Sequence, residues 1–176
     1  ASLDIEKDKI LLTSIPRDLW VPDIETANKK INSAYAEGEG KREGGGLVLA
    51  KAIVGKVLGQ KIDYAVRIDF DGFVRAVDLI GGLDVNIERS FDDYEYPIEG
   101  KDDDSCGQPL EELEALATES SQLEAFPCRY MHAHFDKGDK RMDGKTALIF
   151  VRSRHGTGME GSDFARSNRQ EKIIKA

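Results

Sequence analysis

Residues 63–87 read DYAVRIDFDGFVRAVDLIGGLDVNI, and this stretch sets the expectation for the fold class. Residues 63–70 alternate apolar and polar side chains between breakers, which predicts a strand. Residues 71–80 carry apolar side chains one helical turn apart and end at two glycines, which predicts a helix capped by Asp71. Residues 83–87 form a second short strand. A strand, a helix and another strand in succession indicate an α/β protein whose sheet is covered by helices.

Further elements are predicted on both sides of this stretch. A short apolar run that ends at Pro16 is typical of a buried strand. A helix-period segment follows three consecutive glycines, and Gly59 is a suitable end for it. Asp143 and Ser162 are good N-caps for two later helices. The additional strands are expected at residues 9–15 and 150–155, and the additional helices at residues 47–58, near 111–126, at 147–149 and at 163–175.

The chain is acidic and moderately apolar. Its 176 residues carry a formal net charge of -8, and 40% of them are hydrophobic. This length is enough for one domain with its own core, and we expect residues 1–176 to form one domain with an acidic surface insertion at residues 94–139. The acidic balance argues against general nucleic-acid binding, which uses a broad basic surface. No apolar run approaches the roughly 20 residues that span a bilayer.

The two cysteines lie inside this expected insertion. A bond between Cys106 and Cys128 would close a loop, and the chain-entropy model gives it about 3 kcal/mol of stabilisation. Two free buried thiols are the alternative. A disulfide is favoured if the domain lies outside the cytoplasm, so the sequence leaves both states open.

Residues 152–170, RSRHGTGMEGSDFARSNRQ, concentrate arginines in a protein of the opposite net charge. A guanidinium keeps its charge at any working pH and binds phosphate or carboxylate oxygens through two parallel hydrogen bonds. If residues 150–155 are extended, Arg152 and Arg154 point to one face and repel each other unless an anion lies between them. We interpret the segment as one wall of an anion site, for which a pyrophosphate is the best candidate.

The predicted last helix collects polar and apolar side chains on one side, at about 100° per residue. These side chains are Asp163, Arg166, Arg169, Gln170, Ile173 and Ile174. An apolar stripe is normally buried, so this side is expected to face the interior or a cleft, with a solvated face as the usual alternative for charged residues. Three roles remain open for Asp163: stabilising the helix dipole by about 0.3–1 kcal/mol, orienting an arginine, or catalysis.

Two weaker patterns involve histidines. His132 and His134 would share one face of a strand, where a transition metal can bridge them. The sequence shows no third ligand and leaves metal binding open. We interpret His155 as a hydrogen-bonded polar residue, with a catalytic base as the alternative.

Six motifs occur in an order that resembles one known family. They are SIPRD (14–18), KINSAYAEG (30–38), IDFDGF (68–73), LIGGLDV (79–85), MDGKTALIFVRSRH (142–155) and SDFARSNRQ (162–170). Together they resemble the catalytic domain of the LytR–CpsA–Psr family over most of the chain outside residues 94–139. Any one motif alone is weak, whereas six in order are specific.

This resemblance implies a fold, a location and a reaction. The fold would be a three-layer α/β/α sandwich with a central mixed sheet and a deep apolar pocket for a lipid. Such bacterial proteins sit on the outer face of the cytoplasmic membrane, at the cell wall, held by an N-terminal transmembrane helix. They are phosphotransferases that move a glycopolymer from a polyprenyl pyrophosphate carrier onto peptidoglycan, with Mg²⁺ assisting. Teichoic acid, capsule and arabinogalactan all remain open as the polymer.

The resemblance also implies site residues. The catalytic set would be Arg17, Asp18, Arg152, Arg154, Asp163, Arg166 and Gln170, with substrate contacts from Arg169, Lys30 and Asn32. Arg17 directly follows a predicted strand, where open sheets place ligands, and would bind the pyrophosphate. Asp18 would hold Mg²⁺ or orient an arginine, and Asp18 or Asp163 would accept the proton of the acceptor hydroxyl. Because a transferring phosphoryl group spreads charge over its oxygens, the arginines would act by positioning and electrostatic stabilisation.

One family feature is missing. The family's first strand carries an acidic, DTIM-like motif upstream of the stretch that matches residues 1–15, and this chain has none. The chain thus resembles a family domain cut after its first strand and without its membrane anchor, which places its Mg²⁺ binding in question. A non-catalytic domain that binds polyprenyl phosphate or wall glycans is therefore one alternative to the transferase. A pyrophosphatase acting at the same site is another.

Overall fold

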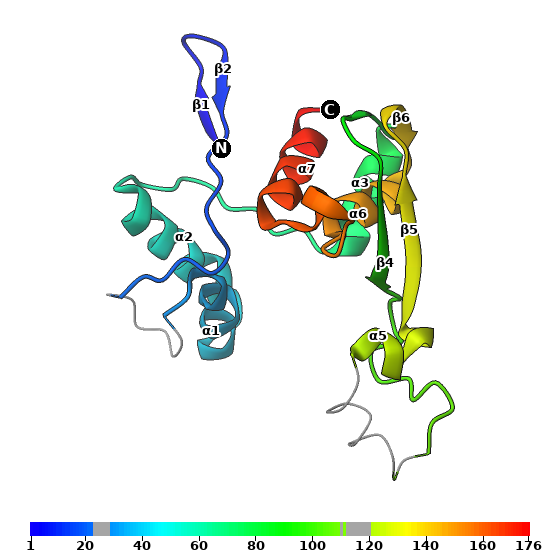
Figure 1. Cartoon of the computed structure of the whole chain (residues 1–176). Helices are drawn as coiled ribbons and strands as arrows, with labels where there is room; N and C mark the ends of the chain where they lie inside the picture. The colour runs from blue at the N-terminus through cyan, green and yellow to red at the C-terminus, as the bar shows by residue number, and fades with distance from the viewer. Residues whose placement is uncertain (23–28, 110, 112–120) are drawn as a thin grey trace. The chain divides into compact units, whose positions relative to one another are not determined.

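The computed structural model describes residues 1–22, 29–109, 111 and 121–176 (Figure 1). These residues divide into two compact units, residues 1–68 and residues 69–176. Both units contain helices and short strands, so the mixed α/β class predicted from the sequence is confirmed. Among the described helices, we find none with the length and hydropathy of a membrane span.

The first unit contains a small hairpin and two helices. Strands β1 (Ser2–Asp4) and β2 (Lys9–Leu11) are antiparallel, and the 3₁₀ helix η1 (Ile31–Ser33) leads into α1 (Ala34–Lys41) and then α2 (Gly45–Leu58). The helix predicted at residues 47–58 is confirmed, and Gly59 ends it in the left-handed conformation with a φ of 64°. The small core of the first unit consists of Val21, Ala34 and Ile53.

Two glycines allow α1 and α2 to pack closely. A Cβ atom added to Gly38 would lie 2.5 Å from the carbonyl oxygen of Gly45, and one added to Gly45 would lie 2.2 Å from the carbonyl oxygen of Gly38. Both distances are far below van der Waals contact. A side chain at either position would therefore push the two helices apart.

Two predicted strands are wrong. The buried strand expected at residues 9–15 is reduced to β2, whose Ile10 is 68% exposed, because a two-stranded hairpin offers no second layer to bury its side chains. Residues 63–69 form no strand, and Tyr64 is 90% exposed. An alternating pattern becomes a strand only when a neighbouring strand takes up its hydrogen bonds, and among the described residues no strand pairs with this segment.

The described part of the second unit contains two strand pairs and three longer helices. Strand β3 (Leu83–Ile87) pairs with β6 (Gly138–Met142), and β4 (Phe91–Pro97) pairs with β5 (Tyr130–Phe135), both antiparallel. The longer helices are α3 (Phe70–Leu79), α6 (Gly144–Arg152) and α7 (Asp163–Lys175). Shorter turns are α5 (Gln122–Ala125), η2 (Pro127–Arg129) and η3 (Gly158–Gly161). Strand β3 and helix α7 have the bounds that the sequence predicts.

The second unit has an aromatic core. The ring centroids of Phe91 and Phe135 are 5.1 Å apart, and those of Phe135 and Phe150 are 5.2 Å apart. These rings come from β4, β5 and α6, so the core joins one strand pair to a helix. Burial of such a side chain contributes roughly 1.5–3 kcal/mol. The other core residues are Val77, Leu83, Val85, Ile87, Tyr96, Ala133, Met142, Ala147 and Ile173.

The described strands do not form one central sheet. They form three separate two-stranded ladders. Of the two segments whose predicted strands are wrong, one contributes only β2, which pairs with β1 alone, and residues 63–69 supply no strand. The described residues therefore have the expected mixture of helices and strands without the continuous sheet of a three-layer sandwich.

Helix α6 extends further than predicted. An extended segment was expected at residues 150–155, but α6 continues to Arg152. Ala147 and Phe150 are buried at helical spacing, so the apolar run between them forms a helix face rather than a strand. Arg152 and Arg154 therefore do not share one face of a strand.

Side-chain caps start the longer helices. Asp143 and Ser162 each accept a hydrogen bond from the backbone N–H three residues later, which confirms both predicted N-caps. The cap of α3 is Asp69 and not Asp71, because the helix begins at Phe70, one residue earlier than predicted. Asp71 lies in the first turn instead.

The range 94–139, expected to be a surface insertion, also contributes to the core. Tyr96, Ala133 and Phe135 are all buried. Ala133 and Phe135 alternate with exposed residues on β5, whereas Tyr96 follows an irregularity in the pairing of β4 after Asp93. Strand pairing thus brings both ends of this range into the unit.

Between β4 and β5 the chain carries the disulfide. Cys106 and Cys128 are bonded, which decides between the two states left open by the sequence. Of the helix predicted near residues 111–126, residues 112–120 lie outside the described residues. The described helical part is α5, which starts with a capping box formed by Ser121 and Glu124.

Candidate functional site

In the first unit, the predicted residues gather around Asp18. An antiparallel bridge between Trp20 and Lys30 brings two distant segments together. Asp18 Oδ1 accepts hydrogen bonds from Lys30 Nζ at 3.3 Å and from Asn32 Nδ2 at 3.1 Å, and Arg17 Nη1 lies 3.9 Å from Asp18 Oδ2. The hydrogen bond from Lys30 is the main effect that lowers the pKa of Asp18, so this carboxyl group is ionised at neutral pH.

This arrangement limits how Asp18 can bind Mg²⁺. The ion is usually held by one or two carboxylates together with phosphate oxygens and water. Asp18 supplies one half-exposed carboxylate. Among the described residues, the groups of three possible metal ligands do not include it. Within the described part of the chain, Asp18 therefore fits Mg²⁺ as a single ligand beside phosphate oxygens.

In the second unit, Arg152 ends α6 against two aromatic rings. Its guanidinium carbon lies 4.0 Å from the centre of the Phe70 ring and 5.7 Å from the centre of the Tyr96 ring. A cation over a ring face gains roughly 0.5–2 kcal/mol. The planar guanidinium can still donate hydrogen bonds from its edge, so Arg152 is an oriented, half-buried cation.

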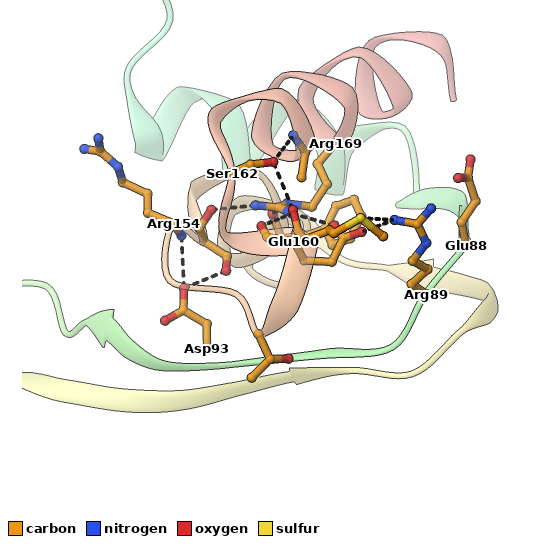
Figure 2. Close-up of polar contacts among 12 residues, drawn as sticks. Glu88, Arg89, Asp93, Arg154, Glu160, Ser162 and Arg169 are labelled. Carbon is orange, nitrogen blue, oxygen red and sulfur yellow. Dashed lines mark hydrogen bonds and ion pairs between the residues drawn. The ribbon is translucent and has the colours of Figure 1, made fainter.

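A buried carboxylate, missed by the sequence analysis, fixes the turn after α6. Asp93 is 1% exposed. Its Oδ2 accepts hydrogen bonds from Ser153 Oγ at 2.6 Å, Arg154 N at 3.0 Å and His155 N at 3.2 Å, and its Oδ1 accepts one from Glu95 N at 3.0 Å. Figure 2 shows the bond between Asp93 and the backbone of Arg154. Burial acts to raise the pKa of Asp93, but these hydrogen bonds outweigh it and lower the pKa. The turn therefore encloses a permanent negative charge.

The last two residues of this turn, Arg154 and His155, are exposed. Arg154 is exposed, and its guanidinium points away from Asp93 (Figure 2). His155 Nδ1 lies 3.9 Å from Glu95 Oε2, which is too far for a hydrogen bond, so both roles considered for His155 stay predictions. The predicted arginine pair thus consists of one ring-packed arginine and one exposed arginine on a fixed turn.

Arg169 is buried, with 3% of its surface exposed. Its Nε donates to Phe150 O at 3.0 Å, its Nη2 to Ser153 O at 2.7 Å, and its Nη1 to Glu160 Oε2 at 2.9 Å and to Glu160 O at 3.0 Å. Arg169 thereby caps the end of α6 and ties it to η3 (Figure 2). These contacts hold the guanidinium of Arg169 within the protein, and the predicted substrate contact stays a prediction.

Asp163 orients Arg166. Arg166 Nη2 lies 2.9 Å from Asp163 Oδ1, and the two side chains are 20% and 83% exposed. Two of the three roles left open for Asp163 fit the structure, since its carboxylate pairs with an arginine and also lies in the first turn of α7. Exposed ion pairs are weak, so this one can open when a stronger anion reaches Arg166.

The buried face of α7 is narrower than the predicted arc. Arg169 and Ile173 are buried, while Gln170 is exposed and Ile174 is 68% exposed. Side chains four residues apart stack along one line of a helix. Arg169 and Ile173 form such a line with the half-buried Ala165, and Gln170 lies outside it.

The second unit also contains a hollow of about 490 Å³. Apolar side chains such as Met159 and Phe164 line it together with charged ones such as Arg89 and Lys172. Of the predicted site residues, only Arg169 is in its lining. Its mixed lining differs from a deep apolar pocket, so the lipid pocket stays a prediction.

Comparison with known proteins assigns the family. The model of the LytR_cpsA_psr family matches residues 1–176. The chain belongs to this family. The match includes residues 94–139, which the sequence motifs left out.

Two relatives of this LytR–CpsA–Psr chain carry the name polyisoprenyl-teichoic acid–peptidoglycan teichoic acid transferase. TagV of Bacillus subtilis is 30% identical over 178 residues, which cover 99% of this chain and 36% of TagV. TagU of Oceanobacillus iheyensis is 27% identical over 177 residues, which cover 99% of this chain and 42% of TagU. The chain therefore spans less than half the length of these curated relatives.

Solved structures of family members share the fold. The crystal structure of B. subtilis TagV aligns with a TM-score of 0.56 at 28% identity, over 92% of this chain and 47% of that one. The structure of B. subtilis TagU aligns with a TM-score of 0.52 at 25% identity, over 92% of this chain and 50% of that one. A structure of TagT with bound octaprenyl pyrophosphate lipid has a TM-score of 0.53 at 20% identity, over 92% and 49%, and shows the common fold alone.

Proposed function

We propose that this LytR–CpsA–Psr chain is part of a phosphotransferase that moves a glycopolymer from a polyprenyl pyrophosphate carrier onto peptidoglycan. The support from relatives is the name that TagV and TagU share, which contains the carrier, the polymer and the acceptor. Teichoic acid is the polymer in those names, and we take it as the first substrate to test, with capsular polymer as the second.

The observation that carries this proposal is the rigid mounting of three arginines in the second unit. Arg169 links the carbonyls at the end of α6 to Glu160, just before α7. Arg152 is the last residue of α6, Arg154 lies on the turn that follows it, and Arg166 lies on α7. Arg169 thus joins the segments that carry these three cations, and the three side chains would have to turn toward an anion to stabilise charge on its oxygens.

In the proposed reaction, an acceptor hydroxyl on peptidoglycan attacks the phosphorus that carries the glycopolymer. The new oxygen–phosphorus bond forms as the bond to the second phosphate breaks, and polyprenyl phosphate leaves. Arg152, Arg154 and Arg166 would stabilise the charge on the phosphoryl oxygens, and Gln170 would position the donor. The proton of the hydroxyl needs an acceptor, and Asp163 can serve once Arg166 turns to the substrate.

For the first unit, the assignment rests on the family motif SIPRD. Arg17 would bind the diphosphate, and Lys30 and Asn32 would contact the substrate while they hold Asp18 in place. Asp18 would hold Mg²⁺, which when bound supplies positive charge beside the diphosphate. The hydrogen bonds that Asp18 accepts from Lys30 and Asn32 support the positioning part of this role.

We also place the reaction outside the cytoplasm, at the outer face of the membrane that holds the carrier lipid. The disulfide between Cys106 and Cys128 supports this location, because disulfides persist in oxidising compartments and are rare in the cytosol. Membrane attachment through an N-terminal helix stays a prediction from the family.

The test is transfer of a lipid-linked glycopolymer to a peptidoglycan acceptor by the purified protein. Arg152→Ala and Arg166→Ala are each expected to lower kcat/KM by about 100-fold or more, since each removes a donor aimed at developing charge. Arg75→Ala is the matched control, because Arg75 is an exposed arginine on α3 outside the predicted set, and its activity should not change.

Other outcomes would identify the rival functions. Activity of both arginine variants within about twofold of the unsubstituted protein overturns their assignment. Phosphate release without linkage to the acceptor would indicate a pyrophosphatase. Saturable binding of prenyl pyrophosphate with no turnover would indicate a binding domain.

A further inference from the structure

Three possible metal ligands lie on the outward face of the β4–β5 pair. Asp92 is opposite His134 in the strand register, and His132, two residues earlier, shares that face. Asp92 Oδ1 lies 2.6 Å from His132 Nε2 and 2.7 Å from His134 Nδ1. The ligand atoms of the three residues are all within 4.8 Å of one another. Strand pairing thus supplies the third ligand that the sequence alone did not show.

His134 has a carboxylate beside each of its ring nitrogens. Its Nδ1 faces Asp92 and its Nε2 lies 3.1 Å from Asp136 Oδ1. In this geometry a neutral imidazole can bind an ion through Nδ1 and donate a hydrogen bond from Nε2 to Asp136.

The surrounding contacts hold the ligands in place. The ring of His132 stacks on Tyr94 with centroids 4.3 Å apart and planes 8° apart. Asp136, which faces His134, is itself bonded by Lys140 Nζ at 3.3 Å. A carboxylate behind a metal-binding histidine is a recurrent arrangement that fixes the ring and raises its basicity.

The backbone of Asp92 is fixed as well. Its N–H donates to Thr157 Oγ1 at 3.1 Å, and its carbonyl accepts from Thr157 N at 2.8 Å. Thr157 belongs to the loop that follows the Arg152–Arg154 turn. The outward ligand Asp92 and the inward carboxylate Asp93 are therefore neighbours on one anchored piece of β4.

We propose that Asp92, His132 and His134 bind a divalent transition metal ion of the zinc type. Two imidazole nitrogens and one carboxylate oxygen are a recurrent set for Zn²⁺, with the fourth position open to water or another ligand. Ligand atoms about 2.0–2.1 Å from a tetrahedral ion lie about 3.3 Å apart. The oxygen of Asp92 would have to move about 0.6–0.7 Å further from each ring nitrogen to reach this spacing. All three side chains are partly exposed, so an ion can enter from solvent.

This site is separate from the Mg²⁺ role assigned to Asp18. Its nitrogen ligands select transition metals, whereas Mg²⁺ prefers oxygen ligands. It also does not depend on the proposed transferase function. Its expected effect is structural, because a bound ion joins β4 to β5 beside the strand residue that anchors the arginine turn, and stabilises the folded state by mass action.

The experiment is a titration of the chelator-stripped protein with Zn²⁺ alone, followed by calorimetry and by the thermal unfolding midpoint. One ion per chain and a raised midpoint are expected. His132→Gln and His134→Gln should each weaken binding by at least about tenfold. The third histidine of the chain provides a matched control: His155→Gln should bind as tightly as the unsubstituted protein.

A readout that needs no variant covers the case in which a substitution prevents folding. Co²⁺ bound to two imidazoles and a carboxylate in a four- or five-coordinate site absorbs visible light far more strongly than aqueous Co²⁺. Strong absorption that Zn²⁺ displaces supports the site. The spectrum of aqueous Co²⁺, binding that survives in the His132→Gln/His134→Gln double variant, or an equal loss in His155→Gln would overturn it.

Discussion

The two units use their charged residues in opposite ways. In the second unit, Asp93 and Arg169 are buried and bonded mainly to backbone groups. In the first unit, Arg17, Asp18 and Lys30 are exposed side chains that meet at the surface. The same residue types therefore hold a fold together in one unit and offer charge to solvent in the other. Burial, and not membership of a motif, separates the two roles.

The second unit also has the larger apolar core. The first unit buries Val21, Ala34 and Ile53, while the second has an aromatic centre that joins β4, β5 and α6. Desolvating a charge costs several kcal/mol unless it is fully hydrogen-bonded, and only a well-packed interior holds the partners in position. We expect the second unit to be the more stable, and to be more sensitive to loss of a charged residue.

The largest effect is expected from Arg169→Met. It leaves Glu160 and the carbonyls at the end of α6 without their buried donor, so the free energy of unfolding should fall by about 3–5 kcal/mol. Urea unfolding followed by circular dichroism measures it. Arg166→Met is the control, with an expected loss below about 1 kcal/mol because its partner Asp163 is exposed. Equal losses in the two variants would mean that burial of Arg169 does not make it more important for stability than Arg166.

The next effect is expected from Asp93→Ala. Ser153 Oγ and three backbone N–H groups lose their acceptor, and unsatisfied buried donors cost about 1–3 kcal/mol each before the turn relaxes. We expect a net loss of about 2–3 kcal/mol in urea unfolding. Asp84→Ala removes an exposed carboxylate from β3 and should change stability by less than about 0.5 kcal/mol. A similar loss in both would show that Asp93 is not a special anchor.

Much of the second unit follows from its sequence. The helix caps Asp143 and Ser162 and the strand at residues 83–87 are local features, determined by side chains within a few residues. The predictions of strands at residues 9–15 and 63–70 were wrong, because a strand depends on a pairing partner that local alternation of side chains does not reveal.

In the candidate site, too, the sequence predicts the local features and misses those that depend on distant contacts. The motifs identified the arginines, but Arg169 is buried by contacts with Phe150, Ser153 and Glu160, which a helix wheel does not include. A signal for Asp93 was available: it occupies an inward position of an alternating strand, two residues after Phe91. A carboxylate at such a position must be hydrogen-bonded or neutral.

A matched pair of glycine substitutions would sharpen the comparison between the units. A Cβ added to Gly144 would lie 2.2 Å from the carbonyl oxygen of Val74, the same distance as for Gly45 against Gly38. Each alanine variant is expected to cost about 1–3 kcal/mol through overpacking. Gly144→Ala should speed hydrogen exchange in the second unit alone, and Gly45→Ala in the first alone. Exchange that rises across both units in either variant would mean that they unfold as one.

The smallest effect concerns acid in the first unit. Glu39 accepts hydrogen bonds from Gly44 N at 3.1 Å and Gly46 N at 3.0 Å, and the bond from Gly44 is the main effect that lowers its pKa. A lowered folded-state pKa stabilises the fold above the unfolded carboxyl pKa of about 4.3, and this contribution is lost as the pH falls through the folded value. Glu39→Gln should therefore flatten the acid limb of unfolding measured from pH 6 to pH 3, while Glu43→Gln, an exposed neighbour, should leave it unchanged. Identical acid limbs for Glu39→Gln and the unsubstituted protein would remove Glu39 as a determinant of the first unit's stability.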